Sequence, residues 1–126
     1  MQPKYLFFLI LISLSVFAQN RRFERYLNEL KEEFNIIQIN SDSLEKLNTV
    51  LLDTREKEEF DTSHIPNAIY AGYYDFSIEQ FNALNKDTTV VVYCSVGYRS
   101  SVVAEKLIEA GFTDVRNLYG GIFNST

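Results

Sequence analysis

The chain has 126 residues, of which 46% are hydrophobic, 14% aromatic and 23% charged, enough for one compact domain with its own core. Its net charge of −5 comes without a basic patch, which argues against a nucleic-acid partner. One cysteine and one histidine cannot make an intramolecular disulfide or a closed zinc site, and no nucleotide-binding glycine motif occurs. We therefore expect no metal and no cofactor.

The first 18 residues have the pattern of a secretory signal peptide. Lys4 precedes an apolar run, Tyr5–Ala18, which ends in the small-residue pattern Val16-Phe17-Ala18. We expect residues 1–18 to be cleaved, leaving an exported protein, periplasmic or secreted, without membrane contact. The alternative is a retained membrane anchor, although the apolar run is short for a membrane span.

The next segment, residues 19–35, is predicted to be an amphipathic helix that packs on the edge of the domain. Apolar residues recur there at helical spacing between charged ones: Phe23, Tyr26, Leu27, Leu30 and Phe34.

From residue 36 onward short apolar strands alternate with helical patterns. Strands are expected at 36–39, 50–53, 69–70, 90–94 and 115–118, with helical segments after Ser41 or Asp42, from Glu56, after Ser77 and after Cys94. The last helix is expected to end at Gly111 in a left-handed cap, with Phe112 supplying the apolar contact. This alternation predicts an α/β domain with a mainly parallel central sheet and helices on both faces.

The chemistry is concentrated where the fourth strand ends. Val90–Val92 is typical of a strand buried on both faces, and Cys94 follows it. Gly97 then relaxes the backbone, and Ser100 or Ser101 is expected to cap the following helix. The loop N–H groups and the positive end of that helix converge on one spot and favour a thiolate there. We therefore interpret Cys94 as a reactive thiol rather than a core residue.

Polar residues of the first half are given structural roles. Arg55 and Glu59 are four apart and are expected to pair on one helix face. Asp53 and Arg55 should fix the end of the second strand, and His64 should make a structural hydrogen bond in its turn. Three tyrosines are interpreted as loop packing: Tyr70, Tyr73 and Tyr74.

Two motifs together resemble the rhodanese-like domain family. The first is Val50-Leu-Leu-Asp-Thr-Arg-Glu-Lys-Glu-Glu-Phe60 with His64-Ile-Pro-Asn-Ala68, and the second is Val91-Val-Tyr-Cys-Ser-Val-Gly-Tyr-Arg-Ser100 with Gly111-Phe112 and Gly120-Gly121. The resemblance covers residues 36–123 and leaves 124–126 as a tail. Two motifs in this order on the expected strands are specific, whereas Cys-x-x-Gly-x-Arg alone is not.

The resemblance implies a sulfurtransferase of the thiosulfate sulfurtransferase type. Cys94 would be the nucleophile that carries a sulfane sulfur as a persulfide. The implied donor is a small anion such as thiosulfate, and the implied acceptor is a thiol, a protein thiol included, or a cyanide-like nucleophile. The implied substrate-binding residues follow Cys94 directly: Ser95, Val96, Gly97, Tyr98 and Arg99. Their N–H groups would hold the anionic sulfur, Tyr98 would line the mouth, and Arg99 would guide the donor.

The chain departs from the family pattern in two places. Ser63 and Asn67 stand where the family usually has glycine, and Asn67 is the milder change because asparagine tolerates a left-handed backbone. Family members also commonly continue past the double glycine into an aromatic residue and a closing helix, whereas this sequence stops at Ile122-Phe-Asn-Ser-Thr126. We hypothesise that the N-terminal helix covers what that helix normally covers.

Three functional classes use a loop cysteine of this kind. An exported catalytic sulfurtransferase and a non-catalytic sulfur-carrier or redox-partner module both use Cys94, and the sequence does not separate them. A phosphatase or arsenate reductase on the related fold needs five residues between its cysteine and arginine, to wrap a tetrahedral oxyanion. Here only four intervene, which favours a single sulfur atom. The natural donor and acceptor are left open.

Overall fold

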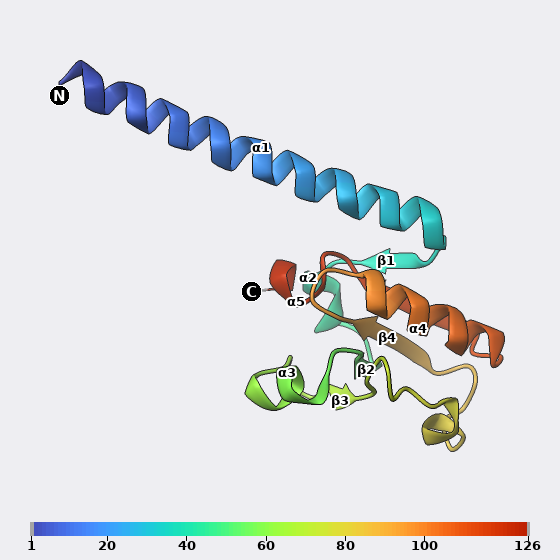
Figure 1. Cartoon of the computed structure of the whole chain (residues 1–126). Helices are drawn as coiled ribbons and strands as arrows, with labels where there is room; N and C mark the ends of the chain where they lie inside the picture. The colour runs from blue at the N-terminus through green and yellow to red at the C-terminus, as the bar shows by residue number, and fades with distance from the viewer. Residues whose placement is uncertain (1, 126) are drawn as a thin grey trace.

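A computed structural model describes residues 2–125 of the chain (Figure 1). The elements, in order, are α1 (Pro3–Phe34), β1 (Ile37–Ile39), α2 (Ser41–Leu44), β2 (Val50–Asp53), α3 (Lys57–Thr62), β3 (Ile69–Tyr70), the 3-10 helix η1 (Ile78–Phe81), β4 (Thr89–Tyr93), α4 (Tyr98–Glu109), β5 (Asp114–Leu118) and α5 (Gly121–Ser125).

All five strands are parallel and lie in the order β1-β5-β4-β2-β3, which puts β4 in the middle of the sheet. Val90 of β4 is level with Val50 on one side and Val115 on the other. Val90, Val91 and Val92 are fully buried. The predicted parallel α/β sheet is confirmed, and the continuous apolar run marks its central strand.

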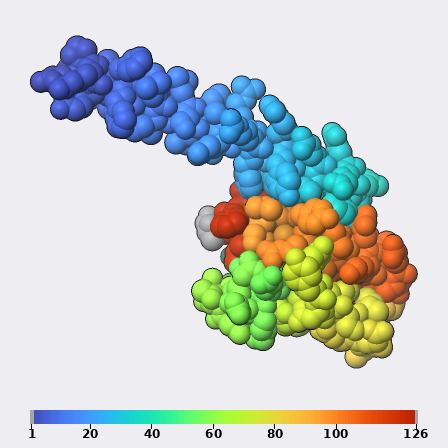
Figure 2. Space-filling view, viewed as in Figure 1, coloured from blue at the N-terminus to red at the C-terminus, as the bar shows by residue number. Residues whose placement is uncertain are grey.

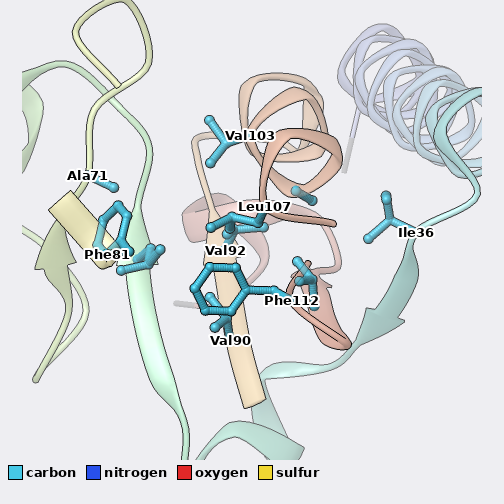
Figure 3. Packing of buried hydrophobic residues seen from close by; sticks show 11 residues of the cluster. Ile36, Ala71, Phe81, Val90, Val92, Val103, Leu107 and Phe112 are labelled. Carbon is cyan, nitrogen blue, oxygen red and sulfur yellow. The ribbon is translucent and has the colours of Figure 1, made fainter. Parts of the chain in front are cut away.

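The side chains of β4 alternate between two cores, one on each face of the sheet. Val90 and Val92 lie on the α4 face, in the larger core (Figure 3). Its other buried residues are Ile36, Leu52, Ala71, Phe81, Val103, Ala104, Leu107, Phe112 and Val115. Val91 and Tyr93 face the opposite core, where α2, the turn at Ile65 and α5 supply the cover. Helical segments therefore cover both faces, as expected.

The C-terminal end of α4 follows its prediction closely. Gly111 takes a φ of 103°, and its N–H donates to the carbonyl of Ile108 while the N–H of Phe112 donates to that of Leu107. This pair of bonds is the Schellman motif, and the ring of Phe112 is buried against the α4 face of the sheet. Asn67 also has the left-handed backbone that was expected of it, with a φ of 69°.

The predicted signal peptide and the amphipathic helix that follows it lie on one continuous helix of 32 residues, α1. Its apolar first half is exposed and extends away from the domain, as Figure 2 shows. By length and composition the helix could cross a membrane, and an N-terminal signal sequence meets the same criterion. The second half packs on the domain through Leu27 and Leu30, which are 3% and 7% exposed.

Three local predictions were wrong. Asn40, rather than Ser41 or Asp42, precedes α2, which ends at Leu44. Ser77 precedes a 3-10 turn, and its hydroxyl bonds Glu79 instead of capping. Ile78, Phe81 and Leu84 recur every three residues, which is the period of a 3-10 helix, so they lie on one side. All three contact the larger core on the α4 face of the sheet. Residues 124 and 125 belong to α5 and not to a tail.

Candidate active site

The thiol of Cys94 lies at the end of β4 beneath the loop that leads into α4, and the residue is only 1% exposed. The N–H of Gly97 donates to its Sγ at 3.1 Å, and the hydroxyl of Ser100 lies 3.5 Å from the same sulfur. The first hydrogen bond of α4 runs from the N–H of Ser101 to the carbonyl of Gly97. The N–H groups of 98–100 open the helix and have no acceptor within it. The sulfur therefore lies where backbone donors and the positive helix end favour a negative charge.

The two serines do not cap α4, contrary to the sequence prediction. The helix begins earlier, because Gly97 occupies the N-cap position with a φ of 138° that other residues rarely adopt. The hydroxyls of Ser100 and Ser101 are buried in the first turn and donate back to the carbonyl of Gly97. Ser100 also bonds the side-chain oxygen of Asn117 in β5, which fixes its hydroxyl beside the Cys94 sulfur.

Helix α5 holds the opposite side of the loop. The N–H of Ile122 donates to the Cys94 carbonyl at 2.9 Å, and the N–H of Phe123 donates to the Ser95 carbonyl at 3.3 Å. Gly121 has a φ of 62°, and a Cβ there would lie 2.4 Å from the Ser95 carbonyl oxygen. The late double glycine therefore lets α5 bind the loop carbonyls while the Gly97 N–H faces the sulfur.

Arg99 is held by α3 rather than extended freely into solvent. Its Nη1 donates to Glu59 Oε2 at 2.9 Å, its Nη2 to Glu59 Oε1 at 3.3 Å, and Nη2 also to the Ser95 hydroxyl at 2.9 Å. The hydrogen bonds from Arg99 lower the pKa of Glu59 against the opposing effect of burial. Burial acts to lower the pKa of Arg99, but Glu59, with a smaller contribution from Cys94, raises it.

The expected pairing of Arg55 with Glu59 was wrong, because each has a different partner. Arg55 Nε and Nη2 bind the carboxylate of Asp53 at 3.0 and 2.8 Å, and Nη2 also donates to the Ser63 carbonyl at 2.7 Å. Arg55 precedes α3, so the four-residue helical spacing does not apply to it. Tyr93 donates to the same carboxylate at 2.8 Å. The expectation that Asp53 and Arg55 fix the end of the second strand is confirmed.

His64 makes the kind of structural contact that was predicted for it. Its Nδ1 lies 2.8 Å from the Phe60 carbonyl, and its ring stacks on the Phe60 ring with centroids 3.8 Å apart. Among the tyrosines, Tyr73 is half-buried and Tyr70 is hydrogen-bonded to Asp75, but Tyr74 is 83% exposed and touches Tyr73 only by its ring edge. Packing therefore describes Tyr70 and Tyr73 and not Tyr74.

The remaining predicted site residues line the loop. Ser95 and Val96 are half-buried, and Tyr98 is 43% exposed at the mouth, with its ring edge against Phe34 of α1. Residues 2–125 contain no group of three or more His, Cys, Asp or Glu side chains placed to hold a metal ion.

Three residues of this region were not predicted as part of the site: Ser100, which lies beside the sulfur, Asn117, which bonds Ser100, and Glu59, which binds Arg99. The sequence did contain an indication for Asn117, because a polar side chain inside a strand with buried neighbours needs a hydrogen-bond partner. It contained none for Glu59, because the partner Arg99 lies 40 residues away in the sequence.

A parallel sheet that presents one buried cysteine in a short loop, with the N–H of the helix N-cap residue Gly97 donating to its sulfur, defines a cysteine-loop α/β domain. The family described as the rhodanese-like domain matches residues 38–125. The chain belongs to this family.

Individual relatives agree on the fold and differ in their stated activity. A tRNA uridine(34) hydroxylase of Staphylococcus aureus is 38% identical over 85 residues, covering 64% of this chain and 27% of that protein. The chain thus spans about a quarter of the length of the curated relatives that it matches.

Two solved structures show the same architecture. A rhodanese-like domain protein of Staphylococcus aureus has a TM-score of 0.64 and 27% identity, over 72% of this chain and 92% of that one. A thiosulfate sulfurtransferase of Pseudomonas aeruginosa has a TM-score of 0.66 and 21% identity, over 81% of this chain and 21% of that one. At that identity the second likeness concerns the fold alone.

Proposed function

We propose that the protein is a sulfurtransferase that moves a sulfane sulfur from a small anionic donor such as thiosulfate to a thiophilic acceptor through a persulfide on Cys94. The observation that carries the proposal is the donor set around Sγ, with the Gly97 N–H at 3.1 Å and the start of α4 directly above it. A persulfide adds one anionic sulfur at this position, and preorganised N–H groups stabilise such a charge without reorganisation.

The reaction needs two displacements and no external oxidant or reductant. The Cys94 thiolate attacks the outer sulfur of thiosulfate, the S–S bond of the donor breaks, and sulfite leaves with the bonding electron pair. The acceptor then attacks the terminal sulfur of the persulfide, the new S–S bond breaks, and Cys94 regains its thiolate. Cyanide leaves as thiocyanate, and a thiolate leaves as a persulfide.

The residues after Cys94 would bind the donor and the persulfide in different ways. The backbone of Ser95, Val96 and Gly97 would surround the outer sulfur, and Tyr98 would border the entrance. Arg99 would supply positive charge at the site while its guanidinium stays bound to Glu59, since three of its hydrogen bonds already go to Glu59 and Ser95. Because Glu59 offsets the charge of Arg99, we expect only weak electrostatic attraction of a dianionic donor to the site.

A non-catalytic sulfur carrier that exchanges with a protein thiol is the second candidate. It is favoured by the pairing of Arg99 with Glu59, which leaves little free positive charge at the loop to attract a small dianionic donor. The RNA chemistry named for the Staphylococcus aureus relative is not proposed, because the net charge of −5 and the absence of a basic patch disfavour an RNA substrate.

We further propose that the protein is exported and that residues 1–18 are removed as a signal peptide. Support comes from the exposed apolar half of α1 and the small-residue pattern before Gln19. The alternative is retention of this helix as a membrane anchor. N-terminal sequencing of the protein from its native cell decides between them: a start at Gln19 supports cleavage, and an intact N-terminus in the membrane fraction contradicts it.

Turnover tests the enzymatic proposal. The purified chain is incubated with thiosulfate and cyanide, and thiocyanate is measured for the wild type and for Cys94→Ser. Catalytic thiocyanate formation that is lost in Cys94→Ser supports the enzyme. A single stoichiometric release without turnover supports the carrier. No sulfur transfer from a thiol that titrates as free contradicts both.

A further inference from the structure

The second half of α1 lies directly against the loop that holds Cys94. Leu30 Cδ1 would be 3.7 Å from a Cβ placed on Gly97, and Leu27 and Leu30 are buried. The cavity left between helix and loop has a volume of about 10 Å³, which is room for one water molecule at most. Helix and loop are thus closely packed at the residue whose N–H binds the sulfur.

Two side-chain contacts fix this part of the helix in place. The hydroxyl of Tyr119, just after β5, donates to Glu24 Oε2 at 2.9 Å. One turn beyond Leu30, the ring of Phe34 meets the ring of Tyr98 edge to face, with centroids 5.7 Å apart. Residues 23–34 are therefore anchored on both sides of the point where they pass the loop, in agreement with the contact between the cyan and orange regions in Figure 2.

Tyr26 lies on this stretch, one residue before Leu27, and is 38% exposed. Burial, followed by the charges of Cys94, Tyr98 and Glu33, raises the pKa of Tyr26. Tyr26 lies one helical turn before Leu30, which meets Gly97, and two turns before Phe34, which meets Tyr98, so the helical repeat puts its ring on the side of α1 that faces the loop.

We propose that residues 23–34 of α1 form one wall of the sulfur-transfer site, and that Tyr26 is a specificity-determining residue in that wall which limits Cys94 to small reaction partners. Because Cys94 is 1% exposed, the side chains that border the loop decide what reaches its sulfur. Tyr26 on α1 and Tyr98 on α4 are both partly exposed, at 38% and 43%. This role rests on the sulfurtransferase function proposed above, but the wall itself can be tested without it.

The test measures how fast the Cys94 thiol reacts with a small and a bulky reagent, iodoacetamide and 5,5′-dithiobis(2-nitrobenzoate), in the full chain in mild detergent. Tyr26→Ala should speed the bulky reagent by roughly tenfold or more and change the small one by less than about twofold. Tyr26→Phe keeps the ring and should behave as wild type. Asn28→Ala, an exposed change one residue beyond Leu27, is the matched control and should change neither rate.

Equal effects of Tyr26→Ala on the rates of both reagents, or no effect on either rate, would contradict the proposal that residues 23–34 wall the site. A second measurement separates this outcome from failure of the proposed function. Discharge of the persulfide to cyanide and to glutathione should shift towards glutathione in Tyr26→Ala. If no variant transfers sulfur while the reagent selectivity still changes, the wall stands and the sulfurtransferase proposal fails.

Discussion

The Asp53–Arg55 pair and the Glu59–Arg99 pair use the same bidentate chemistry in different surroundings. The side chains of Arg55 and Asp53 are 7% and 0% exposed, whereas those of Arg99 and Glu59 are 23% and 36% exposed. The buried pair also binds Tyr93 and the Ser63 carbonyl, so it joins the ends of β2 and β4 to the turn before β3. The half-exposed pair joins α3 to the loop that follows Cys94.

This difference separates a structural role from a functional one. Breaking a buried pair leaves a charge in a low-dielectric interior, so the loss falls on the free energy of unfolding. Breaking a half-exposed pair costs little, because water solvates both partners, so the loss falls on the position of the loop. We therefore expect changes at Asp53 to alter stability and changes at Glu59 to alter sulfur transfer.

Asp53→Asn should have the largest effect on stability. It leaves the buried Arg55 guanidinium without its countercharge, at an expected cost of about 3–5 kcal/mol in the free energy of unfolding, measured by urea denaturation. Asp114→Asn is the matched control, since Asp114 also pairs with an arginine two residues on but at 30% exposure. It should cost no more than about 1 kcal/mol. Equal costs would contradict the assignment by burial.

Tyr93→Phe should have the next largest effect. The hydroxyl donates to Asp53 Oδ2 at 2.8 Å and accepts the Ile65 N–H at 3.1 Å, so its removal leaves the Ile65 N–H without this acceptor and takes one donor from the buried carboxylate. We expect a loss of about 1–3 kcal/mol in the same denaturation experiment. Tyr119→Phe removes a comparable but exposed bond to Glu24 and should cost less. A larger cost for Tyr119→Phe would reverse the ranking.

Glu59→Gln should leave stability within about 1 kcal/mol of wild type, given the exposure of the pair. The kcat/KM for sulfur transfer should nevertheless fall, by roughly tenfold or less, because Arg99 and Ser95 lose the carboxylate that positions them. Glu58→Gln, an exposed neighbour on α3, should match wild type in both measurements. An increased rate in Glu59→Gln would instead make Glu59 a competitor of the donor for Arg99.

The smallest effect concerns the pH dependence of the Glu59–Arg99 pair. Arg99 lowers the pKa of Glu59 below its ordinary value of 4.5. A lowered folded-state pKa contributes stability that is present above the ordinary value and is lost as the pH falls through the folded-state pKa. The difference in stability between wild type and Glu59→Gln should thus be constant from about pH 6 to 8 and should shrink only once the pH falls below the ordinary value, through the folded-state pKa. A difference that first shrinks near neutral pH would contradict this account.

The sequence predicted the fold well where local patterns and burial agree. Val90–Val92 indicated the central strand, and Gly111 with Phe112 indicated the end of α4 together with its cap. The start of α4 was predicted wrongly because serine and glycine both favour the N-cap position, and Gly97, Ser100 and Ser101 lie close together in the sequence. Only the φ of 138° at Gly97 shows that the glycine takes this position.

Long-range contacts explain what could not be predicted at the site. Cys94 and its loop were found from strand, turn and helix order, but Glu59 and Asn117 reach the loop through the pairing of separate strands and helices. Arg55 and Glu59 illustrate the limit, because helical spacing suggested a pair that the start of α3 at Lys57 prevents. The continuity of α1 past residue 18 and its packing on Gly97 were equally out of reach of local patterns.

The most direct test of the central claim is the intact mass of the protein after incubation with thiosulfate alone. The account predicts that the wild type gains the mass of one sulfur atom, that cyanide removes it, and that Cys94→Ser gains nothing. Glu59→Gln should still form the adduct, more slowly. A wild-type mass that stays unchanged while Cys94 is a free thiol would contradict the claim that this loop carries sulfane sulfur.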